Sequence, residues 1–137
     1  KKSIQIDNVN VATWKRYAEI NFSLGFLEEA DLGFTECVNL GNYEVDTWVK
    51  WADVLKEMHD YPRALEVLQH GLEFHPESSV INFRLGGIYL LSSQSLEARF
   101  YLKNAYMSDA KQLNHFYETF PEFRSSSFVK QSLSLKV

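Results

Sequence analysis

Apolar side chains recur every three to four residues along most of this chain, which is the spacing of amphipathic α-helices. Short polar or glycine-containing segments interrupt the pattern and divide it into six helical stretches. The predicted helices cover residues 12–24, 28–40, 46–58, 62–74, 80–91 and 96–108. Taken in order, they form three helix-turn-helix units.

Residues with special backbone preferences support these boundaries. Gly25 and Gly41 come just after predicted helix ends, where glycine readily adopts the left-handed conformation that closes a helix. Pro62 falls in the first turn of the fourth helix, where its missing amide proton removes no helical hydrogen bond. Side chains able to accept a hydrogen bond from the first turn are expected at three other helix starts: Asp46, Ser79 and Ser95.

The chain repeats itself with a period of 34 residues. When Trp14 is aligned with Trp48, small and large residues recur at fixed positions. Small residues recur as Ala18, Ala52 and Gly86; as Ala30, Ala64 and Ala98; and as Cys37, Gly71 and Ala105. Large residues recur as Tyr17, Trp51 and Leu85, and as Phe34, Leu68 and Leu102. Small residues let neighbouring helices approach closely while large ones fill the space between them, so the repeat reflects helix packing.

This pattern resembles the tetratricopeptide repeat, and the second copy carries most of its positions: Trp48, Trp51-Ala52, Tyr61, Ala64, Leu68, Gly71 and Pro76. The other copies depart in places, since Asn42 and Ala110 replace the closing proline and Asn82 replaces the tryptophan. The resemblance implies an all-α fold, a right-handed α-solenoid of helix-turn-helix repeats with a C-terminal capping helix. We expect one domain over 1–137, with repeats at 11–44, 45–78 and 79–112.

The two ends of the sequence indicate what flanks the three repeats. Residues 1–10 are interpreted as the end of a preceding repeat, so we expect a C-terminal fragment of a longer, bacterial protein of this family. Residues 113–137 are expected to form the cap and tail, with a helix over 112–120 that ends before Pro121. For the tail we favour a helix over 128–133, although Leu133, Leu135 and Val137 also alternate like a strand.

Composition limits the classes of function. The chain has 14 Lys and Arg against 18 Asp and Glu, a net charge of −4, which disfavours nucleic acid as a partner. No apolar run approaches the length of a membrane span, and the single cysteine excludes an internal disulfide. We therefore expect a cytoplasmic protein without membrane insertion.

No catalytic or metal-binding motif is recognisable. The four histidines, His59, His70, His75 and His115, lack the spacing of a metal-binding helix. Cys37 occupies a small-residue packing position, so we interpret it as a buried, unreactive thiol. We expect no enzyme activity, no cofactor and no metal.

The resemblance implies that a partner binds along the concave surface formed by the first helix of each repeat. The candidate residues on that surface are Lys15, Arg16, Glu19, Val49, Lys50, Asp53, Val80, Phe83, Arg84 and Leu90. The expected partner is a protein or peptide, with an acidic segment one option.

One basic residue occupies the same position in each repeat, at Arg16, Lys50 and Arg84. Such a row of cations would suit an acidic peptide or a terminal carboxylate. The alternative is pairing within each helix, because Glu19 and Asp53 lie three residues after Arg16 and Lys50. Arg84 has no such neighbour and is expected to be the most available of the three.

The same surface changes from charged to apolar in the third repeat, at Val80, Phe83 and Leu90. These residues either form a pocket for a ligand side chain or are covered by the tail through Phe128, Leu133 and Leu135.

Family members that clamp the C-terminal carboxylate of chaperone tails share only two positions here, Lys15 and Arg84. Glu19, Lys50 and Val80 depart from that clamp. Because Glu19 would repel a carboxylate, we do not assign the chain to that branch.

The sequence therefore predicts a non-catalytic scaffold for protein-protein interaction. Two alternatives stay open. One is a structural module that stacks with upstream repeats or with a second copy, using the N-terminal end for self-association. The other is a docking or regulatory segment of a larger enzyme.

Overall fold

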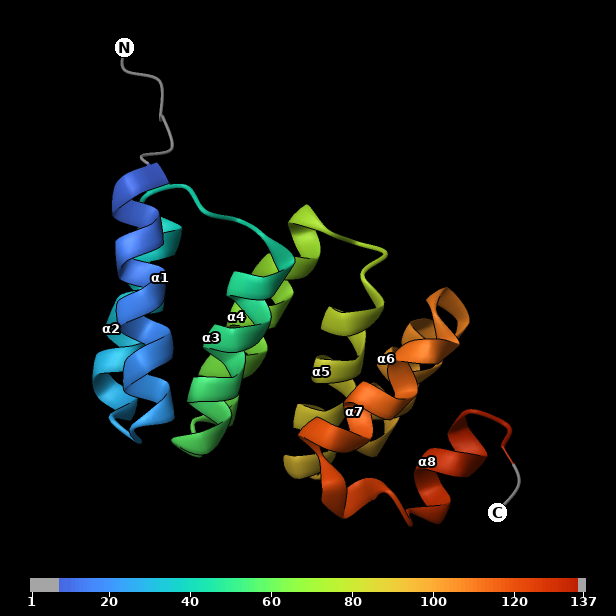
Figure 1. Ribbon diagram of the computed structural model, residues 1–137. Coiled ribbons are helices and arrows are strands. Elements are labelled where there is room, and N and C mark those ends of the chain that lie inside the picture. The colour runs from blue at the N-terminus through green and yellow to red at the C-terminus, as the bar shows by residue number, and fades with distance from the viewer. Residues whose placement is uncertain (1–7, 136–137) are drawn as a thin grey trace. The chain divides into compact units, whose positions relative to one another are not determined.

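The structure is a computed structural model that describes residues 8–135, and all of its regular elements there are helical (Figure 1). The helix predicted at the end of a preceding repeat, over 1–7, lies outside the described residues. The chain divides into two compact units, one ending at Val67 and the other beginning at Leu68, both within one helix.

The N-terminal unit contains α1 (Asn8–Ser23), α2 (Leu27–Asn39), α3 (Val45–Glu57) and the first half of α4 (Tyr61–Phe74). α1 and α2 pack as an antiparallel hairpin (Figure 1). Gly33 of α2 lies against Ala18 of α1, and an added Cβ there would lie 2.7 Å from Ala18 Cβ. The small residues at these positions therefore set how closely the two helices pack.

α3 packs against α2 in the same unit. Trp51 of α3 donates a hydrogen bond from Nε1 to Asp31 Oδ1 of α2 at 2.8 Å. Phe34 of α2 is fully buried, as are Val54 and Leu55 of α3. The first turn of α4 joins through Arg63, which also bonds to Asp31. Apolar packing and one polar cluster thus hold three helices together.

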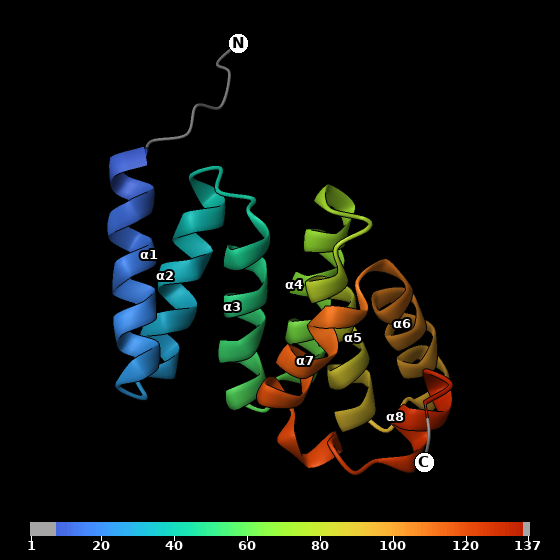
Figure 2. The same cartoon turned by 45° about the vertical axis from the view of Figure 1, so that its right-hand side comes forward.

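The C-terminal unit contains the second half of α4, then α5 (Ser79–Leu91) and α6 (Ser95–Ser108), which lie side by side in both views (Figures 1 and 2). A short 3-10 turn η1 (Ala110–Gln112) leads into α7 (Leu113–Thr119), and a second turn η2 (Pro121–Phe123) leads into α8 (Ser127–Ser132).

Aromatic rings join α7 to α5. Phe116 of α7 lies 5.3 Å from Phe83 of α5 and 5.2 Å from Phe120, measured between ring centroids. Gly87 of α5 makes room for this cluster, because a Cβ there would lie 2.4 Å from the Phe120 ring. α7 therefore acts as the predicted cap and covers one side of α5.

The six predicted helices, the cap helix and the tail helix are confirmed, with ends that differ by at most one residue. The exception is the start of the first helix, which begins at Asn8, four residues earlier than predicted. Gly25 and Gly41 have the positive φ expected of helix-closing glycines, 83° and 98°. Within the described residues, no helix is both long and apolar enough to cross a membrane.

The predicted N-caps were wrong by one or two positions. Ser78, not Ser79, accepts a hydrogen bond from the first turn of α5, at Ile81 N. The residues preceding α3 and α6 are Glu44 and Gln94, and neither side chain caps its helix. Several serines and acidic residues adjoin each helix start, so the sequence alone does not fix which one caps it.

Candidate functional site

The facing sides of α1 and α3 carry a network of charged side chains within the N-terminal unit. Lys15 Nζ lies 2.8 Å from Asp46 Oδ2, and Lys50 Nζ lies 3.2 Å from the same oxygen. Lys50 also bonds to Glu19 Oε2, and Lys15 lies 3.8 Å from Glu44. The network arises because Lys15 and Glu19 are one turn apart on α1, as Asp46 and Lys50 are on α3. We call these five residues the α1–α3 charge network.

The network favours the charged forms of Asp46 and Lys50. Burial tends to raise the pKa of Asp46, but the hydrogen bonds and charges of Lys15 and Lys50 outweigh it and lower that pKa. Burial likewise opposes charge on Lys50, while its bonds to Glu19 and Asp46 raise its pKa. Both lysines therefore have carboxylate partners already in place.

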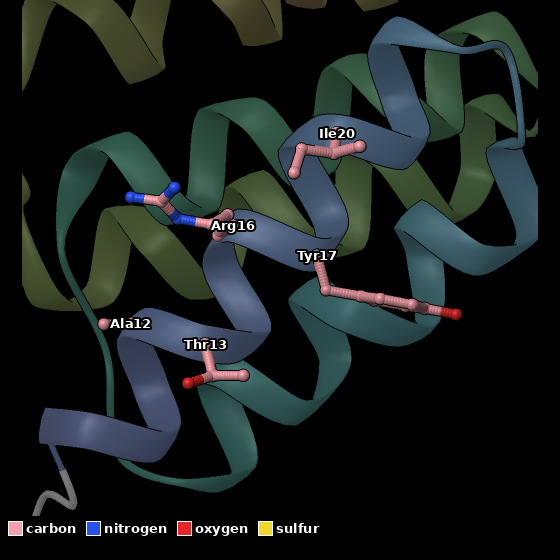
Figure 3. Close-up of a pocket in the computed structure, with 5 residues that line it drawn as sticks. All are labelled: Ala12, Thr13, Arg16, Tyr17 and Ile20. Carbon is pink, nitrogen blue, oxygen red and sulfur yellow. The ribbon is translucent and has the colours of Figure 1, made fainter.

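The three basic residues of the predicted row have different surroundings. Lys50 is paired, although its partners are Glu19 and Asp46 and not the Asp53 expected from spacing. Arg16 is exposed and lines a shallow hollow on the outer side of α1 (Figure 3). Arg84 is only 5% exposed and has interaction partners within the fold. The expectation that Arg84 would be the most available cation was therefore wrong.

The error arises because α5 is buried on all sides at this point. Arg84 lies on α5 between Phe83 and Leu85, all of which are buried. Eight consecutive residues of α5, from 81 to 88, are buried, so this helix has no solvent-facing side over two turns. The spacing of charges along one helix does not indicate how fully the rest of the fold buries that helix.

Of the three apolar residues predicted on this surface in the third repeat, Phe83 is covered within the chain. Phe83 is 1% exposed and packs on Phe116 of α7, while Val80 and Leu90 are half-buried. Phe83 is therefore covered by the chain itself and does not form a ligand pocket. The ring that covers it belongs to Phe116 of α7, and not to the tail residues Phe128, Leu133 or Leu135. Phe128 of the tail instead lies under the Arg99 guanidinium, 5.1 Å from its centre.

The remaining predicted residues lie on α3. Val49 is buried and contributes to packing, and Asp53 is half-buried and has an interaction partner. Among the predicted residues, the structure thus brings together Lys15, Glu19 and Lys50, joined by Asp46 and Glu44.

The hollow on α1 was missed by the sequence analysis. It measures about 340 Å³ and is lined by Ala12, Thr13, Arg16, Tyr17 and Ile20. The signal was present, because Val9, Tyr17, Ile20 and Leu24 are spaced along one face of α1, on the side opposite the buried Ala18.

The described residues offer little support for metal binding or for a nucleophilic thiol. In the described part of the chain, no three His, Cys, Asp or Glu side chains are placed to hold a metal ion. Cys37 is buried, and burial raises the pKa of its thiol to about 11, so the nucleophilic thiolate is rare at neutral pH.

No protein-family model matches the sequence, and no curated protein sequence matches it. Solved structures do resemble it. The first tetratricopeptide domain of Spaghetti (RPAP3), bound to the HSP90 peptide SRMEEVD, has a TM-score of 0.76 at 15% identity, covering 96% of this chain and 99% of that one.

Two further structures resemble the chain to a similar degree. The Yersinia enterocolitica type III secretion chaperone SycD, in complex with a peptide of the translocator YopD, has a TM-score of 0.73 at 19% identity, covering 97% of this chain and 95% of that one. The TPR2B domain of yeast Sti1, in a complex with an Hsp70 peptide, has a TM-score of 0.71 at 14% identity and covers 92% and 94%. Together with the 34-residue repeat, these likenesses show that the chain has the helical-repeat fold of the tetratricopeptide-repeat family.

Proposed function

We propose that this chain is a non-catalytic module that binds a segment of another protein across the exposed side of α1 and α3. The observation that supports the proposal most strongly is the likeness over nearly the whole chain to structures that hold peptides, those of RPAP3, SycD and Sti1. The α1–α3 charge network supports it from within the chain, because it places several charged groups on one partly exposed surface.

The ion pairs within the network limit which charges a ligand can carry. Glu19 and Asp46 already neutralise the Lys50 ammonium, so a ligand carboxylate there would meet two like charges and a purely acidic segment gains little. Glu44 is 71% exposed and is available to a basic group. The proposed ligand is therefore a segment carrying charges of both signs, held through exchange of ion pairs across this surface.

The peptide SRMEEVD serves as a probe of the chaperone-tail alternative. Glu19 lies beside Lys50, and Arg84, the second residue shared with the carboxylate clamp, is buried. We expect no binding of this peptide at about 100 µM, a concentration at which even weak specific complexes are populated.

The proposal is tested by selecting peptides from a random display library on the immobilised chain and measuring the best one by calorimetry. Charge reversal at Lys50, as Lys50→Glu, is expected to weaken binding at least tenfold. Lys111→Glu, which makes the same charge change at an exposed residue of η1, is expected to leave the affinity within twofold. Failure to select any peptide, or equal affinities for both variants, would contradict the proposal.

A further inference from the structure

Two helix faces in the described part of the chain expose contiguous apolar side chains. The first, which we call the α1 face, consists of Val9, Tyr17, Ile20 and Leu24, with exposed fractions of 37 to 75%. The second, the α6 face, consists of Leu96, Phe100 and Met107, which are 79%, 59% and 82% exposed. On each helix these residues lie within one 100° sector, opposite the residues that form the core. Each face therefore has the pattern of a helix surface that another helix covers.

The chain itself shows what covers such a face. Thirty-four residues after Thr13, Tyr17 and Ile20 stand Thr47, Trp51 and Val54 of α3, and all three are buried. α2 packs on α3 there, with Asp31 accepting the hydrogen bond from Trp51. The α1 face is therefore the equivalent of a surface that receives a helix one repeat later.

The hollow on α1 lies within this face. Figure 3 shows Arg16 and Tyr17 pointing to the left and right of the helix, with Thr13 one turn before them and Ile20 one turn after them. An inserted apolar side chain would contact the Tyr17 ring and Ile20, with the Arg16 guanidinium at the edge. The hollow thus suits a large apolar side chain that has an acidic neighbour.

Charges of opposite sign lie on the two sides of the α1 face. Gly33 of α2 faces α1 and Asp31 faces α3, so helical spacing places Glu29 and Glu36 on the side of α2 that points away from α3. The α1 face is also on the side away from α3, because Lys15 and Glu19 contact α3 from the other side of α1. The α1 face is therefore bordered by carboxylates on one side and by Arg16 on the other.

The α6 face has the complementary arrangement. Arg99 and Lys103 lie along one edge of it and Glu97 lies along the other edge, all three exposed. A neighbouring side of α6 is already covered by α8, where Arg99 lies over Phe128 and Leu133 is buried. At the end of the α6 face, Met107 borders a hollow shared with Ser132 and Leu133 at the end of α8, and it remains 82% exposed.

We propose that the α6 face of one copy of this chain docks on the α1 face of a second copy. Phe100 or Met107 fills the hollow beside Tyr17 and Ile20. Arg99 and Lys103 meet Glu29 and Glu36, and Glu97 meets Arg16. Both apolar faces are then removed from water, and charges of opposite sign meet at both edges.

Two different surfaces meet in this contact, so it is heterologous, and each copy keeps one unused face that can bind a further copy. A symmetric contact between two α1 faces is disfavoured, because residues 8–44 contain two Lys and Arg against six Asp and Glu. Two such hairpins repel each other.

The experiment measures mass by sedimentation equilibrium for the full chain and for two variants, Ile20→Asp on the α1 face and Phe100→Asp on the α6 face. The mass of the wild-type chain is expected to rise with concentration between about 10 and 500 µM, the range of a weak interface. Each variant alone is expected to remain at 15.9 kDa. An equimolar mixture of the two is expected to form dimers and no larger species, because each variant supplies the face that the other lacks.

Phe74→Asp, at an exposed apolar residue outside both faces, is the matched control and should associate like the wild-type chain. Thermal melts of all variants identify any that fail to fold, and Tyr17→Asp and Met107→Asp replace them if needed. Raising NaCl from about 50 to 500 mM should weaken association several-fold, since the edge charges are screened. A wild-type chain that stays monomeric overturns the proposal. So does a mixture of variants that stays monomeric while the wild-type chain associates, because that result indicates a symmetric interface.

Discussion

Arg63 of α4 binds Asp31 of α2 through both of its terminal nitrogens. Nη1 donates to Oδ2 at 2.8 Å and Nη2 to Oδ1 at 3.1 Å, while Trp51 of α3 donates to the same carboxylate. Three helices of the N-terminal unit therefore meet at one side chain. Two parallel bonds from a guanidinium to a carboxylate fix orientation as well as distance.

Removal of this carboxylate should destabilise the fold. In Asp31→Ala, Trp51 Nε1 and the Arg63 guanidinium lose their acceptor while remaining partly buried, which costs about 1–3 kcal/mol. Urea denaturation followed by circular dichroism measures the loss. Glu29→Ala, at an exposed acidic residue of the same helix, serves as the control and is expected to change stability by less than about 0.5 kcal/mol. Equal effects in the two variants would show that the cluster contributes nothing specific.

The same carboxylate predicts a dependence on pH. Burial tends to raise the pKa of Asp31, but the bonds from Arg63 and Trp51 outweigh it and lower that pKa below its ordinary value. A lowered folded-state pKa adds stability that is present above the unfolded pKa of about 3.9 and is lost as pH falls through the folded pKa. Between pH 6 and pH 3 the wild-type chain should therefore lose more stability than Asp31→Asn. Parallel losses in both chains would contradict this.

Gly33 sets the distance between α1 and α2. A Cβ at this position would lie 2.7 Å from Ala18 Cβ and 3.0 Å from Ala18 Cα, so the backbone of α1 itself must move. Gly33→Ala is expected to lower stability by about 1–3 kcal/mol, although alanine favours a helix more than glycine does. Urea midpoints measure the change. A stabilised variant would indicate that the two helices are farther apart than described.

Phe116 holds the cap on α5. It is 1% exposed and has ring contacts with Phe83, Phe120 and Phe123. Phe116→Ala should cost about 3–5 kcal/mol, as expected for an aromatic ring removed from a core. Protection of the α5 amides in hydrogen exchange should fall with it. Unchanged exchange in α5 would mean that α7 does not cover that helix.

Cys37 provides a chemical test of burial. Its thiol is buried, and its pKa is raised to about 11 from an ordinary value of 9.0. At pH 8 the thiolate population is then about 100-fold lower than in the unfolded chain, before access is considered. Iodoacetamide should modify the native chain at least that much more slowly than the urea-unfolded chain. Comparable rates would contradict the burial of this residue.

Most of the helical architecture could be predicted from the sequence, because it depends on local and periodic signals. The 34-residue recurrence of small residues such as Ala18 and Ala30 predicted the helix pairs, and both residues are fully buried. Gly25 and Gly41 identified helix ends correctly, since only glycine adopts their backbone conformation without strain.

The candidate site was predicted less well because it depends on contacts between helices. Spacing along α3 suggested that Lys50 pairs with Asp53, yet Lys50 reaches Glu19 of α1, 31 residues away in the chain. Arg84 was expected to be accessible because Gly87 follows it, but that glycine is the position where the Phe120 ring packs. Contacts of this kind join residues on different helices, so the periodic spacing along one helix does not predict them.

The most direct test of the account is to map where a selected peptide binds. In an amide chemical-shift titration of the labelled chain, the account predicts that the largest changes occur on α1 and α3 around Lys15, Glu19 and Lys50, and that they are lost in Lys50→Glu. Changes confined to other helices, or changes that persist in that variant, would contradict the assignment of this surface as the binding site.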